Sequence, residues 1–269
     1  TMPSAAPTVS PTTVSPNPVA IRVDSAPTAW DWGDIVLDRN GQILVDNRPS
    51  YAISVMPPRL LRTPATDRDR IHRRLSEIVG ISAKAIRRKL STRKRHFYEP
   101  VRLKRDVDFQ TVSVVEENRY DLPGVAIEVE ARRGYPPLNG RLPLAPHTLG
   151  DVGLIDQAQY SRMRTRGYRY DDQIGKRGVE RLCEQMLRGS EGVKYIEVNA
   201  RGREVGSFPE RMEPSVSGSD IELTIDWRLQ LVAEKTFNDT LKGSLIAMDP
   251  RSGELLALVS SPGFHPRSI

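Results

Sequence analysis

The chain has 269 residues, so it can hold one large domain or two ordinary ones with enough core for stability. Only 6% of the residues are aromatic, which favours an elongated, polar, multi-lobed shape over a single thick core. The net charge of +6 favours anionic partners such as nucleic acid, acidic lipid headgroups or another acidic polymer.

The single cysteine, Cys183, excludes an internal disulfide. It lies on the apolar face of a predicted helix, so we expect a small core side chain and not a reactive thiol. No run approaches the roughly 18 apolar residues that a membrane-spanning helix needs, and the N-terminus has no charged region followed by an apolar one. The sequence therefore predicts a soluble chain without a transmembrane segment or signal peptide.

Residues 1–32 are rich in proline, serine and threonine and bury too little apolar surface to offset their ordering entropy. We expect a disordered or extended tether, stiffened by its prolines. Trp30 and Trp32 close this segment and are predicted to hold it against the body.

Two apolar runs then flank a turn. Residues 34–37 and 42–45 surround Asn40-Gly41, a pattern typical of a β-hairpin. Residues 46–49 are expected to interrupt the second strand, and residues 50–55 alternate as a third strand.

Residues 66–79 have helical apolar spacing, with Thr66 as the predicted N-cap. The predicted buried stripe of this helix consists of Ile71, Leu75, Ile78 and Val79. Ser82 is expected to cap a second short helix that ends at Leu90.

The densest basic cluster spans residues 87–96. It is either a phosphate-binding patch or a solvated helix end, and the second interpretation is favoured because no aromatic side chains alternate through it. Ser91 and Lys94 match the Ser-x-x-Lys signature of acyl-enzyme serine chemistry. We reject this match because a lysine flanked by Arg93 and Arg95 in open solvent stays charged and cannot accept a proton.

Strands are predicted over 101–106 and 125–129, with a helix capped by Asp108 between them. His147 has no metal-ligand companion at helical or loop spacing, so a structural or surface histidine is expected, and no metal or other cofactor is predicted. Asp156 is expected to cap another helix.

A glycine-rich loop precedes the next helix. Gly175 and Gly178 suit a tight backbone path that side chains would block. Residues 179–187 place their apolar side chains on one helix face, and Gly189 is the predicted left-handed cap. A strand over 195–198 then leads to a predicted reversal at 199–202.

Residues 208–219 contain proline and serine and are predicted as a hinge. A strand over 221–225, a helix capped by Asp226 that continues towards Leu241, and a hydrophobic hairpin over 243–260 follow. We expect an unpaired strand edge and partly uncovered apolar side chains to make this end prone to aggregation. These side chains are Leu255, Leu256, Leu258 and Val259.

Together, these motifs resemble class B penicillin-binding proteins, and the elongation-type branch most closely. The matching positions are Asp38, Arg39, Asn40 and Gly41; Asn47, Pro49 and Tyr51; Arg133, Tyr135 and Pro136; Gly150 and Gly153; and Gly175, Gly178, Glu180, Gly189, Arg201 and Gly202. The sequence departs from the family pattern in three places: Trp32 replaces an arginine, the stretch between Gly33 and Asp38 is one residue longer, and Asp151 replaces an aromatic residue.

The resemblance implies an α+β fold, an elongated pedestal over residues 33–215 followed by a hinge and the start of a transpeptidase domain over 216–269. It implies that this region has no catalytic residues, because the Ser-x-x-Lys, Ser-x-Asn and Lys-Thr-Gly motifs of the complete serine-type DD-transpeptidase are missing. It further implies a periplasmic location and two partners, a SEDS-family glycosyltransferase and an MreC-type scaffold protein, beside an acidic cell-wall polymer or membrane surface.

Three alternatives remain open at this point. The chain could be a free-standing regulator that competes with the full enzyme for its partners. It could be an enzyme of another kind, although Gly175-x-x-Gly178 alone is a weak phosphate-loop motif. It could also be a basic nucleic-acid-binding module, which is disfavoured because aromatic side chains do not accompany the basic cluster.

Overall fold

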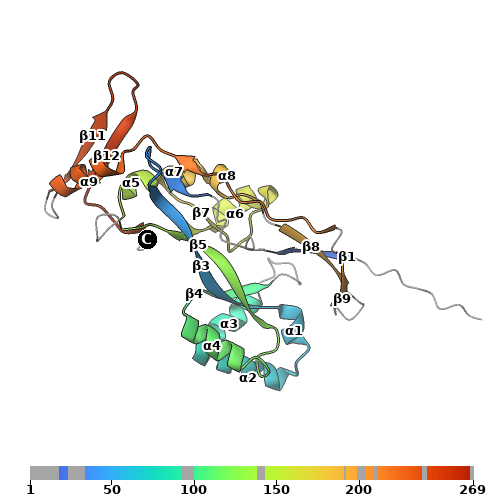
Figure 1. Cartoon of the computed structure of the whole chain (residues 1–269). Coiled ribbons are helices and arrows are strands. Elements are labelled where there is room, and N and C mark those ends of the chain that lie inside the picture. The colour runs from blue at the N-terminus through green and yellow to red at the C-terminus, as the bar shows by residue number, and fades with distance from the viewer. Residues whose placement is uncertain are drawn as a thin grey trace, which may run out of the picture.

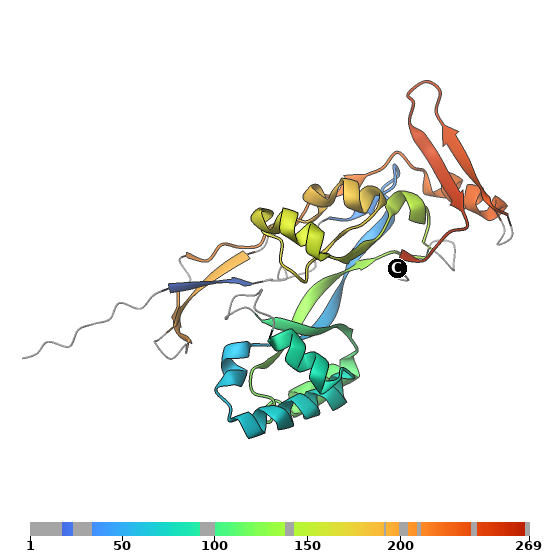
Figure 2. The same cartoon turned by 180° about the vertical axis from the view of Figure 1, so that it is seen from behind.

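The computed structural model describes residues 18–23, 34–91, 100–137, 143–190, 192–198, 204–208, 211–237 and 241–266. The fold is α+β and elongated, as predicted, with separate lobes joined by two long strands (Figures 1 and 2). We call the lobes the head, the linker body, the side sheet and the C-terminal unit. Among the described residues, no helix combines the length and the apolar character needed to cross a bilayer.

The long strand β3 (Ile43–Val55) organises the central sheet. It pairs antiparallel with β2 (Val36–Leu37), β4 (Val101–Val107) and β5 (Val125–Gly134), and β10 (Ile221–Glu222) pairs parallel with β2. The predicted hairpin is confirmed, but the predicted interruption at 46–49 is wrong because β3 runs through it. Pro49 is tolerated because, among the described strands, residues 46–50 pair with β5 alone, which leaves one side of the strand as an edge.

The head consists of helices packed on one end of this sheet. These helices are α1 (Pro57–Leu61), α2 (Ala65–Val79), α3 (Ala83–Leu90) and α4 (Phe109–Glu117). The predicted stripe of α2 packs into a core with Ile53, Ile86 and Leu103. Ser82 and Asp108 cap α3 and α4 as predicted, whereas the N-cap of α2 is Pro64 and not Thr66.

The linker body is built from short elements. These are α5 (Pro146–Leu149), β6 (Val152–Leu154), α6 (Gln157–Met163), the 3-10 helix η1 (Arg164–Arg166), β7 (Gln173–Gly175), α7 (Gly178–Leu182) and α8 (Glu184–Leu187). Asp156 caps α6 with a complete capping box. The single helix predicted over 179–187 is wrong, because the backbone leaves helical geometry at Cys183 and α7 and α8 are separate.

This break changes which apolar side chains are buried. Val179, Cys183 and Leu187 pack against the end of the central sheet. Leu182 is 85% exposed and Met186 is 54% exposed, so the expected single apolar face does not exist.

The side sheet contains β1 (Pro18–Val23), β8 (Gly192–Val198) and β9 (Glu204–Ser207) in the order β1-β8-β9. Residues 18–23, within the segment predicted as a disordered or extended tether, form an extended strand that pairs with β8. The predicted reversal with Arg201 and Gly202 lies outside the described residues, as do Trp30 and Trp32. Gly189 has the predicted left-handed conformation.

The C-terminal unit consists of α9 (Trp227–Thr236) packed against the antiparallel hairpin of β11 (Gly243–Met248) and β12 (Leu255–Ser261). Asp226 caps α9 as predicted, but the helix ends at Thr236, before Leu241. In the hairpin Leu255, Leu256 and Leu258 are partly exposed, as predicted, whereas Val259 is buried. Ile246 and Met248 of β11 are more exposed still.

Candidate functional site

The predicted turn after β2 contacts the segment that leads into α9, far along the chain. Asp38 is fully buried, and its carboxylate accepts hydrogen bonds from the backbone N–H groups of Asn40 (2.8 Å), Gln42 (2.8 Å) and Trp227 (3.0 Å). Burial alone would raise the pKa of Asp38, but the hydrogen bonds from Trp227, Gln42 and Asn40 together outweigh it and lower the pKa. The carboxylate therefore stays charged and joins the turn to the start of α9.

Neighbouring bonds extend this contact along the chain. The Arg39 N–H donates to the Ile225 carbonyl at 3.0 Å, and the Leu223 N–H donates to the Leu37 carbonyl at 2.9 Å. The Asn40 side-chain amide donates to Asp226, the residue that caps α9, at 3.2 Å. We call this set of contacts between residues 37–42 and 223–227 the clamp. Because of the clamp, the segment that follows the predicted hinge is fixed to the central sheet.

The linker body holds the C-terminal unit at two further points. The Glu234 carboxylate accepts from the Ala145 N–H at 2.6 Å, where α5 begins. His147 contacts the Pro262 carbonyl at 3.0 Å through Nε2, and its ring meets Phe264 edge-on at 4.9 Å between centroids. His147 thus has a packing contact, as expected for a structural histidine.

A buried ion pair lies where β5 meets α7. Arg133 donates from Nε to the Glu180 carboxylate at 2.6 Å, and their side chains are only 7% and 3% exposed. The Tyr135 hydroxyl donates to the same carboxylate at 3.3 Å, and Arg133 also donates to the Asp34 carbonyl. Burial raises the pKa of both Tyr135 and Asp34.

Replacing one partner of a buried ion pair strongly destabilises the fold, because the charge of the other partner stays buried without compensation. The pair therefore ties the long β3–β5 ribbon to the linker body. Asn47 joins the same cluster, since its side-chain amide donates to Asp34.

Glycines allow two loops of the linker body to touch. A Cβ atom at Gly178 would lie 2.4 Å from the Thr148 carbonyl oxygen, and one at Gly150 would lie 2.0 Å from the Arg177 carbonyl oxygen. Both residues also have positive φ, +55° and +84°. The two loops can pack this closely because both positions are glycine, and this contact places α7 beside α5.

The structure thus gathers sequence-predicted positions into two groups. The clamp contains Asp38, Arg39, Asn40 and Gly41, and the junction at α7 contains Asn47, Arg133, Tyr135, Gly150, Gly175, Gly178 and Glu180. Pro49 and Tyr51 lie along β3, Pro136 follows β5, Gly153 lies in β6 and Gly189 follows α8, outside both groups.

Sequence reasoning missed Gln230, a fully buried residue of α9. Its side-chain amide donates to the Leu258 carbonyl at 3.0 Å and accepts from the Leu258 N–H at 2.8 Å. The amide therefore acts as a short extra strand beside β12 and partly closes the edge that was predicted to be unpaired. A polar residue on the expected apolar face of the helix was the pattern that could have revealed it.

The contacts in these groups hold elements of the fold together. Ser91 is exposed at the end of α3, where its hydroxyl donates to the Arg88 carbonyl at 3.1 Å, and Lys94 lies outside the described residues. Within the described ranges, no cluster of His, Cys, Asp and Glu side chains has the geometry of a metal site.

Similarity to known proteins agrees with this architecture. Relatives of this chain include peptidoglycan D,D-transpeptidase MrdA of Acinetobacter baumannii, 32% identical over 250 residues, and MrdA of Escherichia coli, 31% identical over 249 residues. Each match covers 91% of this chain but 34% and 37% of those relatives, so the chain spans about a third of their length.

A complex between penicillin-binding protein PBP2 and MreC from Helicobacter pylori has a similar fold, with a TM-score of 0.70 at 20% identity. That similarity covers 94% of this chain and 44% of the solved one. Residues 33–223 match the penicillin-binding protein dimerisation domain, well over half of the chain. The chain therefore belongs to the penicillin-binding protein dimerisation domain family.

Proposed function

We propose that this chain is the non-catalytic pedestal region of a periplasmic peptidoglycan DD-transpeptidase that acts in cell-wall synthesis and cell shape. The pedestal holds the catalytic domain at a fixed position and orientation. It also presents surfaces to a SEDS-family glycosyltransferase and to an MreC-type scaffold protein. Support for a scaffold partner comes from the fold similarity to a PBP2 that was solved together with MreC.

The observation that carries the proposal is the clamp. Asp38 and Asn40 of the first turn hold the start of α9, and β10 extends the central sheet beside β2. A flexible linker would leave the C-terminal unit free to rotate, whereas a charge-assisted, fully buried contact restricts it. The proposal therefore requires that the clamp fixes the orientation of the C-terminal unit.

Spin labels at Thr165 of η1 and Ser244 of β11, both exposed, test this requirement once Cys183 is replaced by serine. Pulsed electron resonance should give one narrow distance distribution, which Asp38→Ala broadens. Arg39→Ala is the matched control, because Arg39 contributes to the clamp through its backbone N–H, which alanine keeps, and its side chain makes a half-exposed ion pair with Glu254 at 3.5 Å. A broad distribution in the unmodified chain, or a narrow one in Asp38→Ala, would contradict the positioning role.

A second measurement addresses the absence of catalysis. Incubation of this chain with a fluorescent penicillin should give no covalent label, because acylation needs an activated serine nucleophile. Covalent labelling would show that the chain has its own active site and would overturn the pedestal assignment.

A further inference from the structure

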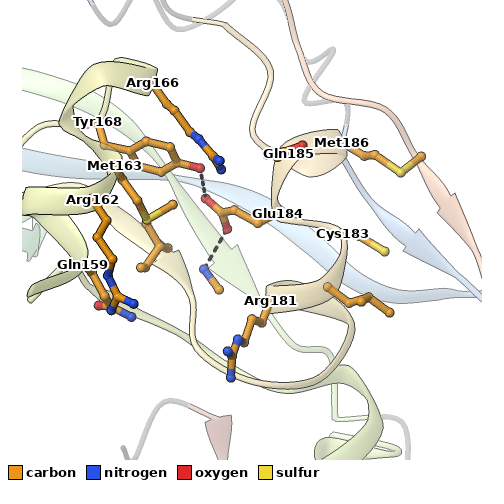
Figure 3. A pocket seen from close by; sticks show the side chains of 13 residues that line it. Gln159, Arg162, Met163, Arg166, Tyr168, Arg181, Cys183, Glu184, Gln185 and Met186 are labelled. Atoms are coloured by element: carbon orange, nitrogen blue, oxygen red, sulfur yellow. Dashed lines mark hydrogen bonds between the residues drawn. The ribbon is translucent and has the colours of Figure 1, made fainter.

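The linker body contains a groove that plays no part in the clamp. It has a volume of about 680 Å³ and lies between α6–η1 and α7–α8 (Figure 3). Ile174 and Tyr168 form buried parts of its lining. A second cavity of about 450 Å³ continues it towards β8 and shares Arg166, Tyr168 and Gln185 with it.

Three arginines line the groove from different elements. Figure 3 shows Arg162 and Arg166 on one side and Arg181 on the other, with Glu184 between them. In the described part of the chain, no carboxylate forms a salt bridge with any of the three. Their charge is therefore available to an anionic group that enters the groove.

Glu184 offsets only part of this charge, because it is one carboxylate beside three arginines in the lining. Its two carboxylate oxygens accept hydrogen bonds from the Tyr168 hydroxyl at 3.1 Å and from the Gly175 N–H at 2.7 Å (Figure 3). Glu184 therefore holds α8 against β7, and each of its carboxylate oxygens already accepts a hydrogen bond. With three arginines and one carboxylate among its side chains, the lining of the groove has a net positive charge.

Apolar side chains adjoin these arginines. Because the chain breaks at Cys183, Leu182 and Met186 face solvent while Val179 and Leu187 enter the core. Burying such an exposed apolar side chain on binding is favourable, because it removes apolar surface from water. The groove thus combines apolar contact points with unpaired cations.

From this combination we infer that the groove binds a segment of a partner protein that carries acidic side chains next to a large apolar side chain. The acidic groups pair with Arg162, Arg166 and Arg181, and the apolar side chain packs on Leu182 and Met186. A concave site with cations on both walls suits an inserted peptide, whereas a flat membrane surface contacts protruding residues. The inference does not depend on the pedestal assignment, because the groove shares no residue with the clamp.

A library of random 12-residue peptides displayed on phage and panned against the full chain tests this inference. The selected peptides should be enriched in Asp and Glu beside Leu, Ile, Phe or Trp. Their affinity should fall at least about tenfold in the double variant Arg166→Glu/Arg181→Glu and decrease with added salt. Leu182→Ser should weaken the same peptides.

Matched controls exclude general effects of charge and folding. Arg164→Glu reverses an exposed arginine of η1 that does not line the groove, and Leu154→Ser replaces another exposed leucine, so neither should change the affinity. The inference is overturned if panning gives no binder, if selected peptides show no acidic enrichment, or if they bind both groove variants normally. It is also overturned if phosphatidylglycerol vesicles, and not peptides, bind through Arg166 and Arg181. Spin-label distances test the clamp separately, so the two results can be told apart.

Discussion

Asp38 is a single buried carboxylate that accepts backbone N–H groups from positions 40, 42 and 227. Replacing it with alanine leaves these donors without an acceptor, so we expect the free energy of unfolding to fall by about 2–4 kcal/mol. Urea unfolding at neutral pH measures this loss. Arg39→Ala should change the same quantity by no more than about 0.5 kcal/mol, because its ion pair is half exposed.

Because the pKa of Asp38 is lowered, its contribution to the stability of the fold depends on pH in the acidic range. Since the folded-state pKa lies below the ordinary value of 3.8, its stabilisation is complete above that value and is lost as the pH falls through the folded pKa. The stability difference between the native chain and Asp38→Ala should therefore shrink below about pH 4. A constant difference down to pH 2 would show that the carboxylate charge is unimportant.

His72 of α2 is a buried histidine in the head, and among the described residues neither of its ring nitrogens has a hydrogen-bond partner. Burial lowers its pKa, as do the nearby charges of Arg87 and Arg68, while Asp69 opposes them. Between the folded and unfolded pKa values, His72 is therefore protonated in the unfolded chain but neutral in the folded head. The free energy of unfolding should fall as the pH drops below about 6.5. In His72→Leu, thermal unfolding midpoints between pH 7.5 and 5.5 should depend less on pH; an unchanged slope would assign the dependence to other groups.

At the scale of elements, the contact between α5 and α7 depends on the absence of a side chain at Gly178. Gly178→Ala would combine positive φ with a Cβ placed 2.4 Å from a carbonyl oxygen, so we expect a loss of about 3 kcal/mol or more. Gly41→Ala is the matched control, because its φ is also positive but no atom lies within 4 Å. It should cost only about 1 kcal/mol, and equal losses in chemical denaturation would refute the role of close packing.

The edge of β12 depends on a side chain from α9. In Gln230→Leu the N–H and C=O groups of Leu258 lose their partner, which should cost about 2 kcal/mol. Hydrogen exchange should accelerate at the Leu258 amide. Lys235→Ala, an exposed change in the same helix, should leave that amide protected. Unaltered protection in Gln230→Leu would mean that the strand edge is closed by another group.

At the scale of the whole molecule, exposed apolar side chains collect on the C-terminal unit. Val232 of α9 is 61% exposed and Ile246 of β11 is 63% exposed. The double variant Val232→Ser/Ile246→Thr should therefore raise the solubility limit without lowering the thermal midpoint. Removal of all residues from Ile221 onward is a different change, because β10 and Trp227 pack on the central sheet and their loss should destabilise the rest.

Local patterns alone predicted much of the architecture. The Asn-Gly hairpin, the helix caps at Ser82, Asp108, Asp156 and Asp226, and the buried stripe of α2 all depend on residues close together in the sequence. The family motifs also pointed to positions that the structure gathers at the clamp and at α7. Such features can be predicted because a turn or a cap is stabilised by bonds within a few residues.

Only the tertiary structure decided which of these residues meet. The partner of Asp38 at Trp227 is distant in sequence, as is that of Arg133 at Glu180, and no periodicity contains that information. The same limit explains the wrong prediction of a single helix over 179–187, where packing of Val179, Cys183 and Leu187 on the sheet overrides local spacing. The sequence by itself thus determined most of the elements and several of their caps, whereas long-range burial of charge and apolar surface decided how the clamp, the junction and the groove are assembled.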